Sequence, residues 1–238
     1  MTSHRTRQIL ATLLDGDPQP GGLPHELAAW SSRSLPVSGA GIVVMVAHQP
    51  ASTVAATDSV AMGLEDLQFV LGEGPCVESS VSGRSVLVPD LLRVDADRWP
   101  AYANGALDLG ARALFALPLR VGAIRLGVMD LYRESPGPLL DGDLAEALAF
   151  ADAATALLLH LQAQAEASTS GDPASPFELH DGRAEIHQAT GVIAVQTGLS
   201  LAVALVVLRS RAYALDRPVL QVAREVLAGT LNVSRGEP

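Results

Sequence analysis

The sequence predicts an α+β fold in which a mixed region of strands and helices is followed by a purely helical tail. Two observations lead to this prediction. Short apolar runs bounded by Gly and Pro lie within the first 165 residues, whereas the residues after 177 show helical periodicity. The segment between the two regions, EASTSGDPASP at 166–176, is small, polar and proline-bearing, as a linker would be.

Four apolar runs in the first region have the length of strands. Gly41–Ala47 and Arg84–Pro89 stand apart, whereas Arg112–Leu119 and Ile124–Tyr132 flank a short turn at Gly122. Two such runs joined by a glycine-bearing turn favour antiparallel pairing. We therefore expect the last two runs to form a hairpin.

The stretch Leu144–Gln164 predicts a helix of several turns, because it is rich in Ala and Leu and contains neither Gly nor Pro. Five of its residues recur at alternating steps of four and three. They are Leu144, Leu148, Ala151, Thr155 and Leu158. This spacing makes a narrow seam that fits a helix pairing with a copy of itself. The alternative, with equal weight, is that the helix packs on the sheet.

The tail predicts three helices. The first runs over Glu178–Gln196, Gly198 ends it, and Ser200 caps the second. Asp216 is expected to cap the third helix, with Pro218 in its first turn. The expected apolar faces of the second and third helices are Leu201, Ala204, Leu205, Leu208 and Ala212, and Val219, Val222, Ala223, Val226 and Leu227.

Charge divides the chain at the same place. The net charge is −10, and every cationic residue is an arginine. Residues up to 177 carry 10 Arg against 20 acidic residues, whereas those from Glu178 onward carry 6 of each. Because an acidic surface repels phosphate, any contact with nucleic acid is expected in the last 60 or so residues.

Cysteine usage and hydropathy indicate a cytoplasmic protein. The single cysteine excludes an internal disulfide framework, which fits a reducing compartment. The N-terminal stretch does not resemble a signal peptide, and no apolar run approaches the roughly 20 residues that span a bilayer. We therefore expect no membrane contact.

No motif of catalytic chemistry or metal binding is apparent, so we expect no enzyme, no cofactor and no metal site. The six histidines are scattered, and the chain has no phosphate-binding glycine loop.

Cys76 follows Gly72, Gly74 and Pro75 in LQFVLGEGPCVESS, which places it at or just after a turn. Two acidic neighbours in sequence, Glu73 and Glu78, disfavour a reactive thiolate. A structural side chain is the preferred interpretation.

The order of the motifs resembles a known architecture. LEDLQFVLGEGPCVESSVSGRSVLVPDL, followed by DRWPAYANGALDLGARALFALPLRVGAIRLGVMDLYRESPGPL, is similar to the GAF domains found fused to ANTAR modules in actinobacterial regulators. The tail is similar to the ANTAR domain itself, whose R-x-x-I-x-x-A-x-G and L-R-x-x-A patterns it carries. These residues are Arg183, Ile186, Ala189 and Gly191, then Leu208, Arg209 and Ala212.

The resemblance implies a division into an N-terminal segment at 1–20, a GAF sensory domain at 21–165, a linker at 166–177 and an ANTAR domain at 178–234. GAF domains are modules with a six-stranded antiparallel sheet flanked by helices, and they bind small ligands or partners. ANTAR domains are three-helix bundles that bind paired hairpins in nascent messenger RNA and prevent termination. They generally act as dimers, so a homodimer is expected here.

Seven residues of the tail are expected to contact RNA. Arginines bind phosphates or stack on splayed bases, and small residues allow a close approach of the backbone. The residues are Arg183, Ala189, Thr190, Gly191, Arg209, Arg211 and Ala212. Two alternatives stay open: Ala189 and Ala212 could be helix-packing positions, and Arg209 could clamp the bundle from within.

Thr190 departs from the resemblance, because many ANTAR domains have a lysine there. The missing cation favours an alternative in which the protein is a sensor or scaffold whose tail only dimerises. A third hypothesis, a regulator that binds duplex DNA, lacks a basic recognition helix. The ligand of the GAF domain cannot be named from the sequence.

Overall fold

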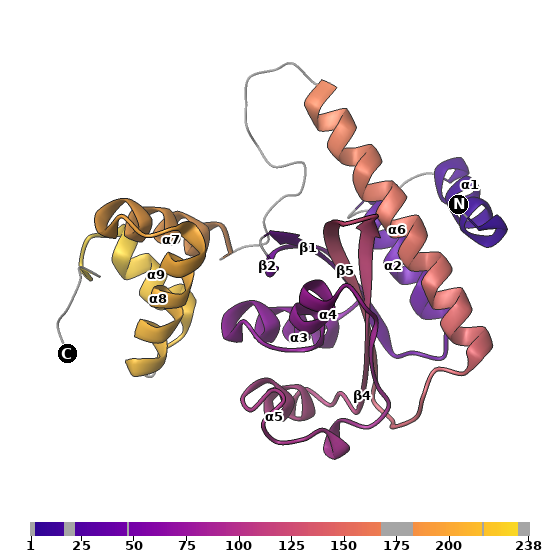
Figure 1. The fold of residues 1–238 in the computed structure, drawn as a ribbon, viewed down its shortest axis with the longest axis horizontal. Helices are drawn as coiled ribbons and strands as arrows, with labels where there is room; N and C mark the ends of the chain where they lie inside the picture. Colours follow the sequence, from indigo (N-terminus) through magenta and orange to yellow (C-terminus); the bar gives the residue numbers. More distant parts are fainter. Residues whose placement is uncertain (1–2, 17–21, 47, 168–182, 216, 233–238) are drawn as a thin grey trace. The chain divides into compact units, whose positions relative to one another are not determined.

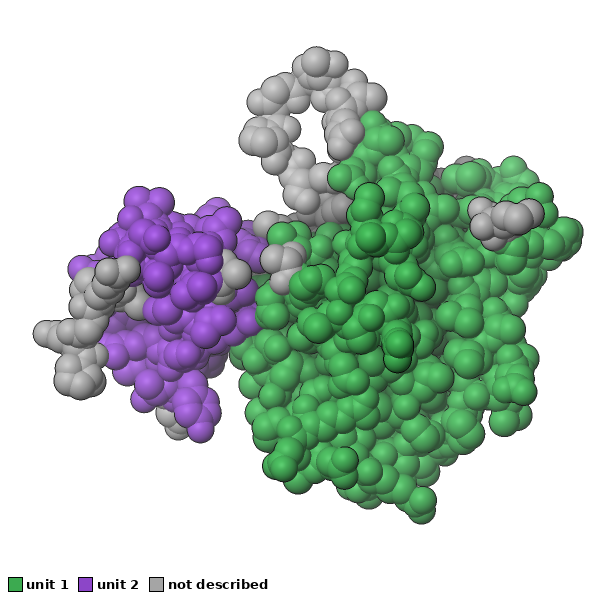
Figure 2. Space-filling view, in the orientation of Figure 1, with its two compact units in different colours: residues 1–178 green, residues 179–238 purple. Residues whose placement is uncertain are grey.

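The computed structural model describes residues 3–16, 22–46, 48–167, 183–215 and 217–232. The chain divides into two compact units, Met1–Glu178 and Leu179–Pro238 (Figure 2). We call them the N-terminal unit and the C-terminal unit and describe each by itself.

The N-terminal unit is built on an antiparallel sheet with the strand order β2-β1-β5-β4-β3. The strands are β1 (Gly39–Val46), β2 (Gln49–Ala56), β3 (Val86–Val88), β4 (Ala113–Val121) and β5 (Ile124–Arg133). The part of the chain that the structure describes therefore contributes five strands to this sheet, where the resemblance implies six.

The expected hairpin is present as β4 and β5, which turn at Gly122 with a φ of 60°. Strand β1 matches its prediction closely, whereas β3 is only three residues long. Strand β2 was not predicted from the sequence, because QPASTVAA lacks large apolar residues and contains Pro50. It lies at the edge of the sheet, where a proline in a strand is tolerated.

Helices cover both faces of the sheet (Figure 1). On one face lie α2 (Gly22–Ser34) and α6 (Asp141–Ala167), with α1 (His4–Asp15) against α6. On the other lie α3 (Ser59–Leu71) and α4 (Pro75–Ser82), with α5 (Tyr102–Asp108) beside α3 and a 3₁₀ turn, η1 (Leu91–Arg93), in the preceding loop. Since both faces are covered, the inner strands are apolar almost throughout.

Helix α6 confirms and extends the predicted helix over Leu144–Gln164. Of the proposed pairing seam, Ala151, Thr155 and Leu158 are buried in the core of the N-terminal unit, and Leu148 is 43% exposed. These positions favour the alternative in which the helix packs on the sheet. By length and composition Asp141–Gln164 is also apolar enough to cross a membrane, in contrast to the expectation that no apolar run approaches this length, and half of its most apolar window is buried within the fold.

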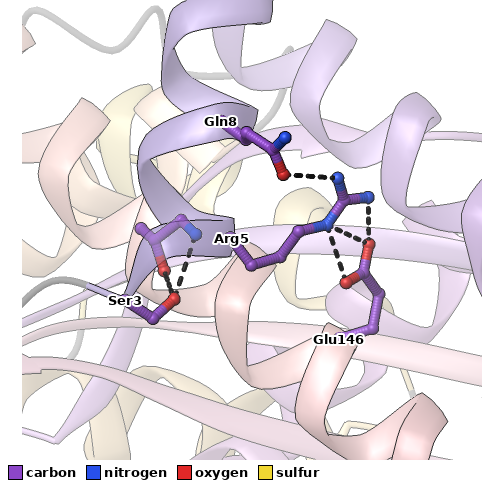
Figure 3. A network of polar contacts seen from close by, with 5 residues as sticks. Ser3, Arg5, Gln8 and Glu146 are labelled. Carbon is purple, nitrogen blue, oxygen red and sulfur yellow. Dashed lines mark hydrogen bonds and ion pairs between the residues drawn. The ribbon is translucent and has the colours of Figure 1, made fainter.

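A polar contact joins the first helix to the last one of this unit (Figure 3). The Arg5 guanidinium on α1 donates to both carboxylate oxygens of Glu146 on α6, at 2.9 Å from its Nε. Ser3 caps α1, because its hydroxyl accepts a hydrogen bond from the Thr6 backbone amide at 3.0 Å. The expected N-terminal segment at 1–20 thus contains a helix that packs on α6 and belongs to the N-terminal unit.

The described part of the C-terminal unit contains α7 (Arg183–Thr197), α8 (Leu201–Ala214) and α9 (Val219–Leu227). Ser200 caps α8 as predicted, and Gly198 follows α7 with a φ of 69°. The predicted start at Glu178 and the predicted cap at Asp216 lie outside the described residues; Pro218 precedes α9.

The predicted apolar faces of α8 and α9 are correct except at their ends. Leu201 is 64% exposed and Leu227 is 37% exposed, whereas the other eight residues are buried. Both exceptions lie in terminal turns of their helices, where fewer neighbouring side chains are available to cover them.

Candidate functional site

A group of polar side chains, all buried except the half-buried Asp130, lies between the sheet and the helices α3, α4 and α5. It comprises Glu65 and Gln68 on α3, Cys76 on α4, Tyr102 on α5 and Asp130 on β5, and we call it the polar cluster. Glu65, Gln68, Cys76 and Tyr102 are each at most 1% exposed. Buried carboxyl groups are costly unless they are neutralised or hydrogen-bonded. The cluster is therefore the feature of the N-terminal unit that packing alone does not explain.

The turn in GEGPC sets the position of the cysteine. Helix α3 ends at Gly72 in the left-handed region (φ 68°), and Gly74 precedes α4 with a φ of 129°. Pro75 then stands in the first turn of α4, where its missing N–H costs nothing. Cys76 follows it and points into the interior, fully buried. The prediction that Cys76 comes directly after a turn is confirmed.

Gln68 holds the cluster together. Its side-chain oxygen accepts a hydrogen bond from the backbone amide of Cys76 at 2.7 Å, and its Nε2 donates to Glu65 Oε2 at 3.2 Å. The amide also hydrogen-bonds to the Asp130 carboxylate. One buried side chain thus joins α3, α4 and β5.

The environment of Asp130 disfavours its charged form. Burial raises the pKa of Asp130 well above its usual range, and the nearby Glu65 carboxylate, which also shares a hydrogen bond with it, raises this pKa further. A hydrogen bond between two carboxyl groups requires that one of them carry a proton. The Oδ2 atom of Asp130 is buried and has no hydrogen-bond partner among the residues that the structure describes.

Two glycines make room for these side chains. A Cβ atom on Gly41 of β1 would lie 2.5 Å from Glu65 Oε1, and one on Gly74 would lie 2.8 Å from Gln68 Oε1. Both distances are shorter than any ordinary contact. Neither position can carry a larger side chain without displacing a member of the cluster.

The motif GEGPC and the motif Asp97–Pro100 (DRWP) meet at the rim of the cluster. The Glu73 carboxylate accepts hydrogen bonds from the backbone amides of Ala101 and Tyr102, at 2.8 and 2.9 Å, at the start of α5. Glu78 and Arg98 form an ion pair at 2.7 Å. The two acids that the sequence places beside Cys76 are therefore engaged elsewhere, and the carboxylates near its thiol are those of Glu65 and Asp130.

The comparisons with known proteins agree with this architecture. The sequence matches the family model of the GAF domain over residues 26–158. The chain belongs to the GAF domain family. The N-terminal unit is thus a GAF domain, which is a small-molecule sensing fold.

Solved structures support the fold of this GAF domain. It is similar to the GAF domain of a phosphoenolpyruvate-protein phosphotransferase from Acinetobacter, with a TM-score of 0.51, 10% identity, and coverage of 71% of this chain and 96% of that one. The GAF domain of the corresponding protein from Coxiella burnetii gives a TM-score of 0.51 and 16% identity, covering 69% and 99%. No curated protein matches the sequence.

The polar cluster lines a narrow cavity inside the GAF domain. The cavity has a volume of about 10 Å³, and its walls include Glu65, Gln68, Tyr102 and Asp130. This volume is close to the room that one water molecule needs. In this conformation the cavity has room for a single water molecule or ion and not for a larger ligand.

The seven residues predicted to contact RNA lie in different environments of the C-terminal unit. Ala189, Thr190 and Ala212 are buried, at 0%, 4% and 1% exposure. The Thr190 hydroxyl donates to the Ile186 carbonyl oxygen at 2.7 Å, one turn earlier in α7. Their burial agrees with the helix-packing alternative for the two alanines and commits the Thr190 hydroxyl to its own helix.

The other four predicted residues are closer to the surface, or their side chains are not described. Arg209 and Arg211 are half-buried, and burial lowers the pKa of Arg209 to about 10. Gly191 faces open space, since a Cβ atom there would meet no heavy atom within 4 Å. The side chain of Arg183 lies outside the described residues. Of the seven, Gly191 and Arg211 are the best placed to meet a partner.

Two further arginines of this unit are paired with acids. Arg224 on α9 binds Glu185 on α7 at 2.7 Å, and Arg217 binds Glu225 at 2.9 Å. The first pair links α9 to α7, and in both pairs the acid neutralises the charge of the arginine. The electrostatic attraction of the bundle for phosphate is correspondingly small.

Sequence reasoning missed three residues. Tyr213 on α8 is 90% exposed, Glu65 is buried, and Asp130 is half-buried with its Oδ2 atom enclosed. A charged residue between Met129 and Leu131 in an apolar strand was a signal that could have pointed to Asp130. No comparable signal existed for Tyr213, because its exposure depends on how α8 packs.

Proposed function

We propose that this protein is a signal-regulated RNA-binding regulator of transcription antitermination and is not an enzyme. Its GAF domain receives a small ligand or signal, and the C-terminal unit binds paired hairpins in nascent messenger RNA as part of a cytoplasmic homodimer. The proposal is supported by the succession of the two motif sets along the chain, and by the three helices that carry the second set.

The proposal of RNA binding depends chiefly on two side chains at the surface of α8. Tyr213 presents an almost fully exposed aromatic ring, and Arg211 lies two residues before it. Unpaired bases in hairpin loops are recognised by stacking on aromatic rings, and arginine binds the adjacent phosphates. A bundle with few unpaired cations depends on such stacking more than a basic domain does. We therefore assign Tyr213 and Arg211 the leading roles in RNA contact.

A second candidate function is favoured by the same helix. Leu201, Val203 and Val206 are 64%, 46% and 55% exposed. Exposed apolar side chains on one helix are typical of a protein–protein contact. The alternative is a sensor or scaffold protein whose C-terminal unit only dimerises and does not bind RNA.

Fluorescence anisotropy with the full chain separates the two functions. The probes are a tandem-hairpin RNA from the region upstream of the gene, the same RNA with scrambled loops, and a DNA duplex, each at low and near-physiological salt. We expect selective binding of the intact hairpins. Tyr213→Ala should weaken it by about 5- to 150-fold, since one stacked base contributes about 1–3 kcal/mol.

Three variants sharpen this test. Tyr213→Phe keeps the ring and should bind as the unchanged protein does, and Arg211→Gln should weaken binding less than Tyr213→Ala. Arg120→Gln removes an exposed arginine from the GAF domain and serves as the control for charge. A chain that dimerises in sedimentation experiments and binds none of the three probes at either salt would support the scaffold function instead.

A further inference from the structure

Three potential metal ligands meet in the polar cluster of the GAF domain. They are the carboxylate of Glu65, the thiol of Cys76 and the carboxylate of Asp130, and one donor atom from each lies within 4.8 Å of the others. They come from α3, α4 and β5, so the fold and not their spacing in the sequence brings them together. Donors bonded to one tetrahedral ion at about 2.0–2.3 Å are separated by about 3.3–3.8 Å. The three side chains would close around an ion from the separation seen here, which is at most 4.8 Å.

The environment of these three side chains favours a bound cation. Glu65 is 1% exposed and Cys76 is fully buried, and among the described residues no arginine, lysine or histidine lines the cavity beside them. The buried Oδ2 atom of Asp130 lacks a hydrogen-bond partner within the described part of the chain. A buried polar atom without a partner is rare in folded proteins and is commonly satisfied by a bound water molecule or ion. A cation at this place would neutralise both carboxylates and engage the orphan oxygen.

The donor set selects the class of ion. Magnesium and calcium prefer oxygen ligands throughout and do not select a thiolate. One sulfur and two carboxylates suit a divalent first-row transition ion such as Zn²⁺, Co²⁺ or Fe²⁺. The adjoining cavity of about 10 Å³ has room for a single water molecule as a further ligand.

We propose that Glu65, Cys76 and Asp130 form a binding site for a divalent transition-metal ion inside the GAF domain. Gln68 is the positioning residue of this site, because it holds both the Glu65 carboxylate and the backbone of Cys76. The inference deepens the sensory half of the proposed function by naming the class of its signal. It rests on the buried cluster alone and stands if RNA binding fails.

Cobalt binding to the full chain tests the site directly. The protein is reduced, stripped with a chelator, and titrated with Co²⁺ without oxygen, because a thiolate bound to Co²⁺ gives a charge-transfer absorption in the near ultraviolet. We expect one equivalent to bind with this absorption, and Zn²⁺ to displace it. Absence of both the absorption and stoichiometric Zn²⁺ binding in the intact, folded chain would overturn the proposal.

Matched variants identify the ligands. Cys76→Ser should abolish the charge-transfer absorption, and the nearly isosteric Asp130→Asn should abolish tight binding while circular dichroism confirms that the chain is folded. Gln68→Ala should weaken binding by about 10- to 100-fold, as expected for a residue that orients a ligand. Asp66→Asn makes the same chemical change on the exposed side of α3 and should bind as the unchanged chain does. Binding that persists in Cys76→Ser with its absorption intact, or in Asp130→Asn at full affinity, would show that the ion lies elsewhere.

RNA binding is read separately in the same preparations. If the metal binds and the hairpin RNA does not, the antitermination function fails and the metal site stands. If the RNA binds and the stripped chain takes up no Co²⁺ or Zn²⁺, the metal site fails alone.

Discussion

Gly41 on β1 lies directly opposite Asp130 on β5 in the register of the sheet. Because Gly41 has no side chain, the space above it is taken by the Glu65 carboxylate of α3, which thereby reaches Asp130. The two carboxyl groups can therefore meet inside the GAF domain because position 41 has no Cβ atom. Four predictions follow from this relationship and from the environments of other residues.

Gly41→Ala is expected to destabilise the GAF domain. The new Cβ atom would lie 2.5 Å from Glu65 Oε1, and the backbone of a central strand cannot move away. Overpacking of this kind lowers the free energy of unfolding by about 1–3 kcal/mol. Urea denaturation followed by tryptophan fluorescence measures it, since Trp30 and Trp99 both lie in this domain.

Gly142→Ala on α6 is the control for that substitution. A Cβ atom there would meet no heavy atom within 4 Å, so the stability should stay the same or rise slightly. Equal stability of Gly41→Ala and Gly142→Ala would refute the close approach of Glu65 to β1.

Gln68→Leu is expected to lower the free energy of unfolding by about 1–3 kcal/mol or more. The substitution keeps a buried side chain of similar size but leaves the Cys76 backbone amide and the Glu65 carboxylate without this partner. Thermal denaturation of the full chain measures the change. Gln8→Leu on the exposed side of α1, where the glutamine makes one long contact at 3.4 Å with Arg5, should change stability by less than about 0.5 kcal/mol.

The stability of the GAF domain should depend on Asp90 at acid pH. A hydrogen bond and ion pair from Arg112 at 3.1 Å lower the pKa of Asp90 below its ordinary value of 3.8. A carboxyl group with a lowered pKa in the folded state stabilises the fold above the ordinary value, and this contribution is lost as the pH falls through the lowered pKa. Asp90→Asn should therefore lower the melting temperature near neutral pH.

The quantity to follow with pH is the difference in melting temperature between the unchanged chain and the Asp90→Asn variant. The gap in melting temperature between the unchanged chain and Asp90→Asn should narrow as the pH is lowered below about 4. A gap that stays constant down to about pH 2 would show that the carboxylate of Asp90 contributes no charge-dependent stability.

Thr190→Lys is expected to destabilise the C-terminal unit instead of restoring an RNA contact. Thr190 is 4% exposed, so the ammonium group would have to be buried or forced out along the helix. A loss of at least about 2 kcal/mol in the stability of this unit is expected. It should be seen by circular dichroism and not by tryptophan fluorescence, because the C-terminal unit contains no tryptophan.

Gln188→Lys adds the same charge at an exposed position of α7, two residues away. Its stability should be close to that of the unchanged chain. If Thr190→Lys is as stable as Gln188→Lys and also strengthens RNA binding, Thr190 lies at the surface of the functional protein.

Local sequence patterns were enough to predict the class of fold and most of the helices and strands. Apolar runs of strand length predicted β1 and the β4–β5 hairpin, because the backbone pairs wherever such runs meet across a tight turn. Ser200 and Gly198 marked helix ends through their own backbone preferences and hydrogen bonds. These features are local, so a few consecutive residues suffice to specify them.

Which side chains meet depends on the packing of the elements against one another. Asp130 lies 54 residues after Cys76 and 65 after Glu65 in the chain, and the layering of α3 and α4 on the sheet brings the three side chains into one cluster. In the same way, the packing of α7, α8 and α9 buried Thr190 and left Tyr213 exposed, although both stand in helical stretches of similar composition. Periodicity shows that a helix has a face, but burial depends on the neighbours that cover it, and those are set by contacts between residues distant in the sequence.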